Sequence, residues 1–458
     1  MGIGISGWPL ARAVARAGQL GVVSGTALSG VFVRRLQDDG VSDELRSILH
    51  RFPIPSVVDE VIAHFAQSRR RASDPYRNIP MLTQQSGQRS HDLLVLASFV
   101  EVAMAKEGHD GIVGINLLTK VQIPTVPTLY GAMLAGVDYV LMGAGVPTHI
   151  PGILERLSLG LDVELPLQVI GTPPAETATT VHFDPARYGS ATILCRPKFF
   201  GIVSGHVLAT ALAKRSNGPV DGFVVELPSA GGHNAPPRGR IELDSNANPL
   251  YGERDRVDFE VLRNLGVPFW IGGGVTSRAH VSDAIALGAT GVQVGTLFAY
   301  CQESGLDGRL RQKIIDQIRS SSVTISTSLR ASPTGYPFKV ASVDGTISDR
   351  KIYAARERKC DLGFLREAYV RPDGALGYRC AAEPVAAYVR KGGLAEDSVD
   401  SACLCNGLMA TCGLAQVRSG GVIEPPIVTS GDCIDEVRSL LGPSANYTAL
   451  DVIAHLGG

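Results

Sequence analysis

One histidine stands in a position where it could move protons. His233 comes after three small residues, beginning with Ala230 and Gly231, that follow the apolar run 221–227. Reactive groups of parallel α/β folds lie where strands end, and an imidazole can accept or donate a proton near neutral pH. The small residues leave room for a flat ligand beside it. We therefore predict that His233 is catalytic, with His206 as the weaker alternative.

Two glycine-containing segments later in the chain could hold an anion. Gly272, Gly273 and Gly274 end one apolar run, and Gly295 and Thr296 end the next. Glycine lets backbone N–H groups come close to an anion, and the start of a following helix favours negative charge. In (β/α)₈ barrels the loops after the seventh and eighth strands form the usual phosphate site. The segments predict a phosphate site; the alternative is a pair of ordinary strand-to-helix turns.

Cysteines gather near the end of the chain. Six of the eight lie in one stretch: Cys360, Cys380, Cys403, Cys405, Cys412 and Cys433. The four that a metal site would use are Cys360, Cys380, Cys403 and Cys405. The paired spacing of a zinc site is absent, and the spacings of iron–sulfur clusters do not match either. Buried thiols acting as small apolar side chains, a metal site and a redox-active pair all stay open, and we assign no metal ligands.

Short apolar runs alternate with helical patterns along most of the chain. Eight runs predict strands: 21–25, 111–117, 138–143, 165–170, 192–202, 221–227, 268–272 and 291–295. Continuously apolar strands that alternate with helices indicate a parallel sheet covered on both faces. Eight such units favour a closed barrel over an open sheet. We therefore expect an α/β fold, a (β/α)₈ TIM barrel, which would bring His233 and the glycine segments to one face.

We expect the chain to divide at about residue 340. Residues 1–340 would form the barrel, with a helical insertion at about 40–95, and residues 341–458 would form a Cys-rich C-terminal extension. The chain opens at Met1-Gly2 and enters a helix at about 9–18 without a strand before it. A barrel normally begins with a strand, so we expect a few upstream residues to belong to the native protein.

Composition limits the class of protein. Hydrophobic residues make up 45% of the 458 residues and charged residues 19%, enough for a large core. Lys and Arg number 43 against 44 Asp and Glu, which argues against a nucleic-acid binder with a broad basic face. No run of about 18 apolar residues predicts a membrane helix, and Arg12 and Arg16 interrupt any signal-peptide core. We predict a cytoplasmic protein with a small-molecule substrate and neither nucleic acid nor membrane as a partner.

The order of the motifs resembles that of the nitronate monooxygenase (2-nitropropane dioxygenase) family. The resemblance rests on residues 230–233, 272–274 and 295–296, and on Asn116 in a strand-end Gly-Ile-Asn-Leu motif. It spans about residues 1–335. It implies a TIM barrel that binds FMN non-covalently, and it extends to the related flavin enoyl reductases.

The resemblance also implies a role for each matching residue. Those that would hold the FMN phosphate are Gly273, Gly274, Gly295 and Thr296, next to Gly272. Those that would face the flavin are Met1, Gly2 and Asn116, with Ala230 and Gly231 as further cofactor contacts. Lys198 matches a strand lysine near the cofactor, and a lysine in so apolar a strand would otherwise need a buried partner. His233 matches the family's active-site histidine.

Two features separate the chain from the simplest members of that family. Ser229 stands where the family often has Glu, and a long polar segment runs from Asn234 to about Arg256. Long loops at an active face shape substrate choice. The sequence therefore supports the cofactor more firmly than the substrate.

Three functions follow as expectations. The first is an FMN-dependent oxidoreductase that oxidises alkyl nitronates or nitroalkanes with dioxygen, where His233 takes the α-proton of a neutral nitroalkane. The alternative is an NAD(P)H-dependent reductase of enoyl thioesters of the fatty-acid or polyketide type, with an acyl carrier or a second copy of the chain as a further partner. The third is a non-enzymatic barrel whose tail binds a partner.

Overall fold

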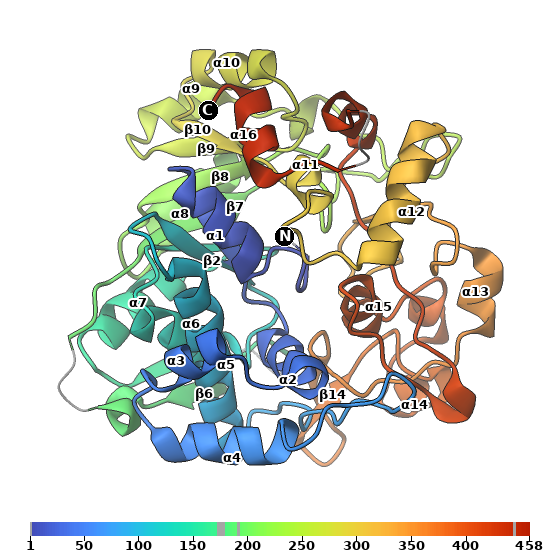
Figure 1. Ribbon diagram of the computed structural model, residues 1–458. Helices are drawn as coiled ribbons and strands as arrows, with labels where there is room; N and C mark the ends of the chain where they lie inside the picture. The colour runs from blue at the N-terminus through green and yellow to red at the C-terminus, as the bar shows by residue number, and fades with distance from the viewer. Residues whose placement is uncertain (1, 172–178, 190–192, 443–445) are drawn as a thin grey trace.

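A parallel sheet of seven strands forms the centre of the molecule (Figure 1). The computed structural model describes residues 2–171, 179–189, 193–442 and 446–458. The strands, in spatial order, are β1 (Gly21–Ser24), β2 (Val113–Leu118), β3 (Tyr139–Gly143), β7 (Lys198–Val203), β8 (Gly222–Glu226), β9 (Phe269–Gly272) and β10 (Gly291–Gln293). All six neighbouring pairs run parallel. Because parallel neighbours need crossover connections, helices separate these strands along the chain.

Helices surround the sheet, as a parallel sheet requires. They are α1 (Trp8–Arg16), α2 (Leu28–Asp39), α5 (Gln88–Lys106), α6 (Thr125–Leu134), α7 (Ile150–Ser158), α8 (His206–Arg215), α9 (Phe259–Asn264), α10 (Arg278–Ala286), α11 (Thr296–Ala299) and α12 (Gly308–Arg319). A separate cluster of Leu141, Phe200 and Val224 packs with Trp270 between the strands. Curled around these side chains, the sheet is consistent with the TIM-barrel-like α/β fold that the sequence predicts.

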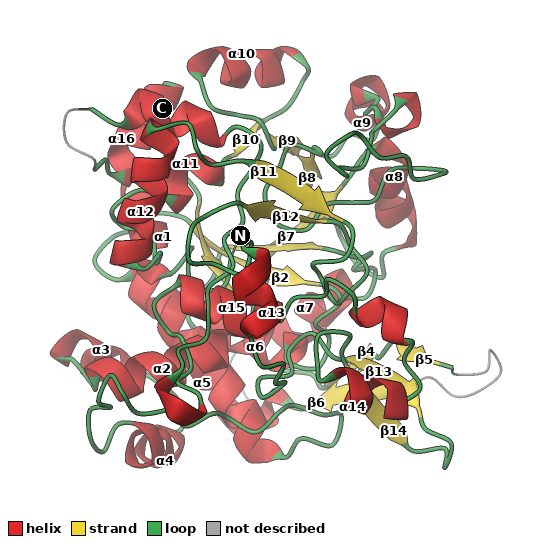
Figure 2. Cartoon of the chain, turned by 90° about the vertical axis from the view of Figure 1, so that its right-hand side faces the viewer, coloured by secondary structure: helices red, strands yellow, loops and turns green. Residues whose placement is uncertain are grey.

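The predicted strand 165–170 is not part of the main sheet, and its assignment as a barrel strand was wrong. Its first half lies in β4 (Val163–Pro166), which pairs antiparallel with β6 (Thr180–Phe183), and its second half is β5 (Val169–Ile170). Figure 2 shows these small strands away from the main sheet, where β5 pairs with β13 (Glu367–Val370). Pro166 cannot donate to a ladder and the exposed Glu164 faces solvent, so this run suits a one-sided strand at an edge.

The main sheet has two edges in the part of the chain that the structure describes. β1 pairs only with β2 and β10 only with β9, so the hydrogen-bonded ladder does not close through these strands. Among the residues described, α1 comes first, and no strand precedes it. The predicted eight-stranded barrel is therefore seen as seven strands. No helix of the described ranges is long and apolar enough to cross a membrane.

The predicted helical insertion contains α3 (Asp43–Leu49) and α4 (Pro55–Phe65), which pack against α5. The remaining elements are β11 (Ile325–Ser328), β12 (Phe338–Ala341), α13 (Arg350–Ala355), β14 (Leu376–Arg379), α14 (Val385–Arg390), α15 (Leu404–Thr411) and α16 (Ala449–Leu456). Their side chains join the core of the preceding residues: Leu404 and Met409 belong to the same buried cluster as Val31 and Phe32. The division of the chain at residue 340 stays a prediction. Residues from both sides of this position belong to the same apolar core.

Candidate active site

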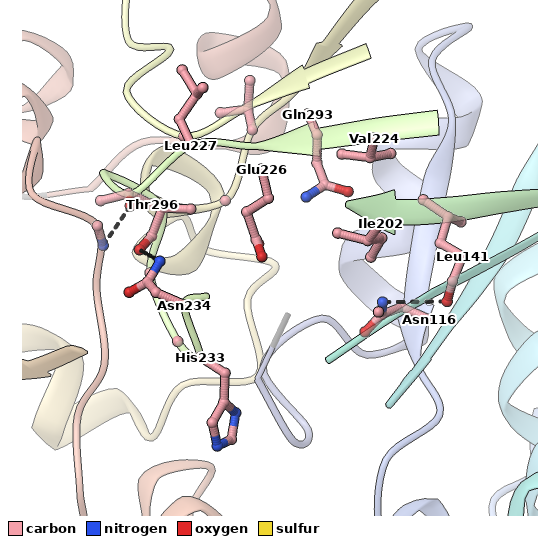
Figure 3. A pocket seen from close by; sticks show the side chains of 18 of the residues that line it. Asn116, Leu141, Ile202, Val224, Glu226, Leu227, His233, Asn234, Gln293 and Thr296 are labelled. Carbon is pink, nitrogen blue, oxygen red and sulfur yellow. Dashed lines mark hydrogen bonds between the residues drawn. The ribbon is translucent and has the colours of Figure 1, made fainter. Parts of the chain in front are cut away.

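The carboxyl ends of the strands open into a cavity of about 800 Å³. Figure 3 shows side chains from several strands and loops converging on it. The predicted residues that line it are Gly2, Asn116, Ala230, Gly231, His233, Gly273, Gly274, Gly295 and Thr296. Gly272 ends β9 one residue earlier and is buried. The cavity therefore gathers residues that lie far apart in the sequence, as parallel strands with a common direction dictate.

An apolar surface lies on one side of the cavity. Leu141, Ile202 and Val224 come from the neighbouring strands β3, β7 and β8, and Figure 3 shows them side by side. Asn116 stands beside them on β2, and its amide donates to the carbonyl of Leu141 at 3.4 Å. Such a surface suits one face of a flat ring system, with polar contacts at its rim.

The loop after β9 brings bare backbone to the cavity wall. Gly273 and Gly274 have φ values of +96° and +74°, a region that disfavours other residues. A Cβ atom on Gly273 would lie 2.9 Å from the nitrogen of Ala230 and 3.1 Å from the oxygen of Leu227. Ser277 then caps α10 by accepting from the nitrogen of His280 at 3.3 Å. Consecutive backbone groups in such a turn form a concavity that suits an anion.

A segment near the end of the chain completes this wall. The nitrogen of Gly431 donates to Thr296 Oγ1 at 3.0 Å, and the nitrogen of Asp432 donates to the oxygen of Ser229 at 3.1 Å. A Cβ atom on Gly431 would lie 2.8 Å from Thr296 Oγ1. The hydroxyl of Thr296 thus accepts from the protein and keeps its own proton to donate to a ligand. Gly431 could not be identified from the sequence, because the residues that it contacts lie more than 100 positions away.

The predicted catalytic histidine is held firmly at the rim of the cavity. His233 Nε2 lies 2.7 Å from Ser332 Oγ, and the ring meets Phe338 edge-on with centroids 4.9 Å apart. The nitrogen of Lys339 donates to the oxygen of Gly232 at 2.9 Å, which ties the loop to β12. Burial, and next the positive charge of Lys120, hold the pKa of His233 well below its ordinary value. The imidazole is therefore neutral at physiological pH.

Hydrogen bonds continue from His233 to Lys120, a half-buried lysine. Ser332 Oγ lies 2.7 Å from Thr334 Oγ1, and Lys120 Nζ donates to Thr334 Oγ1 at 2.9 Å. Lys120 also lies over the ring of Tyr336, 4.0 Å from its centroid. Burial lowers the pKa of Lys120 to about 7. These bonds form a chain from the imidazole to a group that exchanges protons near neutral pH, and we call Ser332, Thr334 and Lys120 the relay.

An acidic side chain that the sequence analysis missed points into the cavity. Glu226 is the last residue of β8, and Figure 3 shows its carboxyl group inside the ring of lining residues. Burial raises the pKa of Glu226 to about 7. A carboxylic residue that ends the apolar run Gly-Phe-Val-Val was a visible signal in the sequence, because strand ends carry the reactive groups of such folds.

Three buried polar atoms of residues that line the cavity have no hydrogen-bond partner among the described residues. They are Gln293 Oε1, Asn234 Oδ1 and Ser430 Oγ. Buried polar atoms without a hydrogen bond are costly, so their presence in a cavity wall points to a ligand or water as the missing partner. Together with the crowded Gly273 and the apolar surface, they fit a flat cofactor that carries a phosphate.

Two other predicted residues lie away from the cavity, and a third is outside the part of the chain that the structure describes. Lys198 begins β7 at the end opposite the cavity; it is exposed, does not line the cavity and lies 5.5 Å from the ring of Tyr139. The expectation of a buried lysine beside the cofactor was wrong, because the residue is solvated. His206 begins α8 and accepts from the nitrogen of Asp258 at 3.0 Å, outside the cavity. Met1 lies outside the described residues.

The fold and the cavity define an α/β protein whose candidate site lies at the carboxyl ends of a parallel sheet. Residues 198–333 match the model of the nitronate monooxygenase family, which confirms the resemblance for the segment that carries His233 and both glycine loops. A probable nitronate monooxygenase of Staphylococcus aureus (strain JH9) is 32% identical over 113 residues. The matched part covers 25% of this chain and about 30% of the length of that relative.

Solved structures overlap almost the whole chain at low identity. FabK from Thermotoga maritima aligns with a TM-score of 0.47 and 15% identity, over 99% of this chain and 88% of that one. A nitroalkane oxidase from Streptomyces ansochromogenes aligns at 0.46 and 12%, over 100% and 92%. The enoyl reductase domain of MlnA from Bacillus amyloliquefaciens aligns at 0.44 and 10%, over 100% and 93%. At TM-scores below 0.5 these overlaps decide neither fold nor function.

Proposed function

We propose that the cavity binds FMN and that the protein is an oxidoreductase that oxidises alkyl nitronates or nitroalkanes with dioxygen. The observation that carries the proposal is the crowded loop at Gly273, where a Cβ atom would lie 2.9 Å from the nitrogen of Ala230. This loop leaves backbone bare at the end of β9, and Gly295 follows β10 closely; in (β/α)₈ folds the loops after the last two strands hold phosphate. The family match over residues 198–333 supports the same choice.

Different lining residues would contact different parts of the cofactor. Those that would hold the phosphate are Gly273, Gly274, Gly295 and Thr296. The flat ring system would lie on Leu141, Ile202 and Val224, and Asn116 and Gln293 would offer amide groups to its polar edge. When bound, FMN would accept and pass on the electrons of the reaction.

His233 would remove the α-proton of a neutral nitroalkane. Its ring is neutral because burial lowers its pKa, so it can accept the proton. His233 Nε2 is hydrogen-bonded to Ser332, whereas Nδ1 has no hydrogen-bond partner in the described structure. Nδ1 is therefore available to the substrate. The C–H bond breaks, its proton moves to Nδ1 and its electron pair stays on the nitronate. The proton on Nε2 can then pass through Ser332 and Thr334 to neutral Lys120.

Reduction of an enoyl thioester with NAD(P)H is the second candidate. It is favoured by Arg238 and Tyr251 of the long segment after His233, which line the cavity. An arginine at the mouth suits the phosphate of a nicotinamide nucleotide or of a pantetheine arm. Reduction of an alkene also consumes a proton, which Lys120 could supply through the relay, since its pKa is about 7.

Spectra and two assays test the proposal. We expect the purified protein to carry about one FMN per chain, visible as flavin absorbance; a colourless protein that takes up no FMN contradicts both candidates. Oxygen consumption with an alkyl nitronate, and no bleaching of the flavin by anaerobic NADPH, supports the oxidase. Rapid bleaching by NADPH, followed by reoxidation with an enoyl thioester, supports the reductase instead.

A further inference from the structure

Residues 429–432 cross two loops of the candidate active site, although they lie far from both loops in the sequence. The nitrogen of Gly232 donates to Thr429 Oγ1 at 2.8 Å, and the nitrogen of Gly431 donates to Thr296 Oγ1 at 3.0 Å. These bonds tie the segment to the loop after β8 and to the residues after β10. We call residues 429–432 the crossing segment. Its side chains therefore hold fixed positions at the cavity wall.

One side chain of the crossing segment is buried without a partner. Ser430 is 5% exposed and lines the cavity, and its Oγ atom has no hydrogen-bond partner among the described residues. An unpaired hydroxyl loses its bonds to water on burial and gains none in return, so such atoms are rare in folded proteins. The missing partner of Ser430 is therefore expected in the cavity.

Close packing of the backbone places Ser430 beside the predicted phosphate position. A Cβ atom on Gly231 would lie 2.8 Å from the carbonyl carbon of Ser430, so only a glycine lets the crossing segment come this near. The next residue, Gly431, is equally crowded, because its Cβ atom would lie 2.8 Å from Thr296 Oγ1. Ser430 thus lies one residue from a direct contact with the hydroxyl that we expect to hold the phosphate.

A second serine hydroxyl covers the glycine loop after β9. Ser229 Oγ lies 3.1 Å from the place that a Cβ atom would take on Gly273, and also 3.1 Å from that place on Gly274. Ser229 lines the cavity as well. Its hydroxyl therefore stands over the same bare backbone whose N–H groups we expect to bind the phosphate.

Positive charge does not account for anion binding at the loops after β9 and β10. Among the described residues, Arg238 is the single lysine or arginine that lines the cavity. Its Nη2 atom lies 3.0 Å from the place of a Cβ atom on Gly205, which precedes α8. Buried Lys339 already donates to Asp432 Oδ1 at 2.6 Å and to Thr327 Oγ1 at 2.9 Å. A phosphate at these loops would therefore depend on N–H and O–H donors.

We propose that Ser430 donates a hydrogen bond to the phosphate monoester of the cofactor, and that Ser229 donates a second one. The inference rests on the proposed FMN site, and it adds a donor from outside residues 198–333, which match the family model. A serine hydroxyl has one proton to donate, and a hydrogen bond to a charged oxygen is stronger than one to a neutral oxygen. Together with Thr296 and the backbone at Gly273, these hydroxyls would hold a phosphate without a cationic side chain.

Comparison of FMN with riboflavin isolates this contact. The two molecules share the ring system and the ribityl chain, and only FMN carries the phosphate. A lost hydrogen bond to the phosphate therefore weakens FMN binding and leaves riboflavin binding unchanged. A general disturbance of the cavity weakens the binding of both flavins, so the ratio of the two dissociation constants reports the phosphate contact alone.

The test measures the Kd of each flavin, by quenching of flavin fluorescence, for full-length protein from which bound flavin has been removed. We expect the ratio of the riboflavin Kd to the FMN Kd to fall about tenfold in Ser430→Ala, and by a smaller factor in Ser229→Ala. Ser401→Ala is the matched control, because Ser401 is 3% exposed and its Oγ atom is equally unpaired, but it does not line the cavity. We expect the ratio in this control to equal that of the wild type.

Ser430→Cys covers the case in which Ser430→Ala does not fold. A thiol is close in size to the hydroxyl and is a much weaker donor, so the ratio should fall in this variant as well. An unchanged ratio in the Ser430 variants overturns the inference and leaves the FMN site standing, and so does an equal loss of affinity for both flavins. A wild-type protein that binds neither flavin overturns the proposed FMN site, and the inference with it.

Discussion

The loops at the strand ends and the C-terminal region contribute to the same cavity in different ways. The strand-end loops supply Gly273, Gly274 and His233, whose roles follow from their immediate neighbours in the sequence. The C-terminal region supplies Gly431 and Thr429, which act only through partners far away in the sequence. One part of the cavity wall can therefore be predicted from neighbouring residues in the sequence. The other part forms only when distant segments come together in the fold.

The strand-end loops and the C-terminal region pack closely against each other. A Cβ atom on Gly231 would lie 2.8 Å from the nitrogen of Gly431, and the nitrogen of Gly232 donates to Thr429 Oγ1 at 2.8 Å. Lys339 is buried and donates to Asp432 Oδ1 at 2.6 Å. If both the strand-end loops and the C-terminal region form the cofactor site, substitutions in either region impair cofactor binding, although by different amounts.

The largest effect should come from Gly273→Ala. The new Cβ atom would stand 2.9 Å from the nitrogen of Ala230, on a backbone with φ of +96°, so the loop must move and the phosphate site with it. We expect purified protein without measurable FMN. Gly266→Ala is the control, because Gly266 has φ of +68° and open space around it. Equal FMN content in both variants would refute the phosphate role of the loop.

His233→Asn should cost the next largest amount. Loss of a general base lowers rates by roughly 10²- to 10⁴-fold, and we expect a loss in this range for neutral nitroalkanes while FMN remains bound. With preformed nitronates, which need no proton removal, the loss should be much smaller. Oxygen consumption with both substrate forms measures this; an equal loss for both would mean that His233 positions the substrate instead.

Gly431→Ala tests the C-terminal half of the wall. Its Cβ atom would lie 2.8 Å from Thr296 Oγ1 and 2.9 Å from the oxygen of Ser229. We expect the Kd for FMN to rise about tenfold, which corresponds to about 1.4 kcal/mol. Gly87→Ala, at a glycine with free space, is the control. An unchanged Kd would mean that the C-terminal region does not contribute to the cofactor site.

The pH dependence should reveal the relay. Lys120 accepts a proton only when neutral, so the rate with neutral nitroalkanes should fall as the pH drops below its pKa of about 7. We expect this fall in rate at low pH to disappear in Lys120→Met. Because the pKa of Glu226 is also about 7, Glu226→Gln is the necessary comparison and should keep the fall in rate. A fall in rate that vanishes in Glu226→Gln instead assigns the titration to the carboxyl group.

The smallest effect concerns the stability of the protein without FMN. The pKa of Glu226 is about 7 in the folded state against an ordinary 4.5, so between these values the folded state holds a proton that the unfolded state has lost. Glu226 therefore makes the free energy of unfolding fall as the pH rises from about 4.5 to 7. Denaturant unfolding at several pH values should give a flatter dependence for Glu226→Gln. An unchanged slope would contradict the buried position of the carboxyl group.

Prediction from sequence succeeded where contacts are local. Seven strands, the loop at Gly273 and the position of His233 follow from periodicity, glycine and strand ends. It failed at 165–170, where Pro166 suits an edge strand. The relay could not be seen, because Ser332 lies 99 residues from His233 and Thr334 lies 214 from Lys120. The sequence already suggested Cys360, Cys380, Cys403 and Cys405 as one group, but only the fold shows that all four line the same small cavity.

The packing of α2 has a practical consequence for anyone who wishes to divide or recombine this protein. Arg34 is fully buried and donates to the carbonyl of Leu414 at 2.6 Å, while a methyl of Met409 fills the space beside Gly30. A fragment that ended at residue 340 would lose the carbonyl of Leu414 and the methyl of Met409, and it would expose this face of α2 to water. Swaps between relatives should therefore exchange the two regions together, and insertions belong in exposed loops such as that near Asn246.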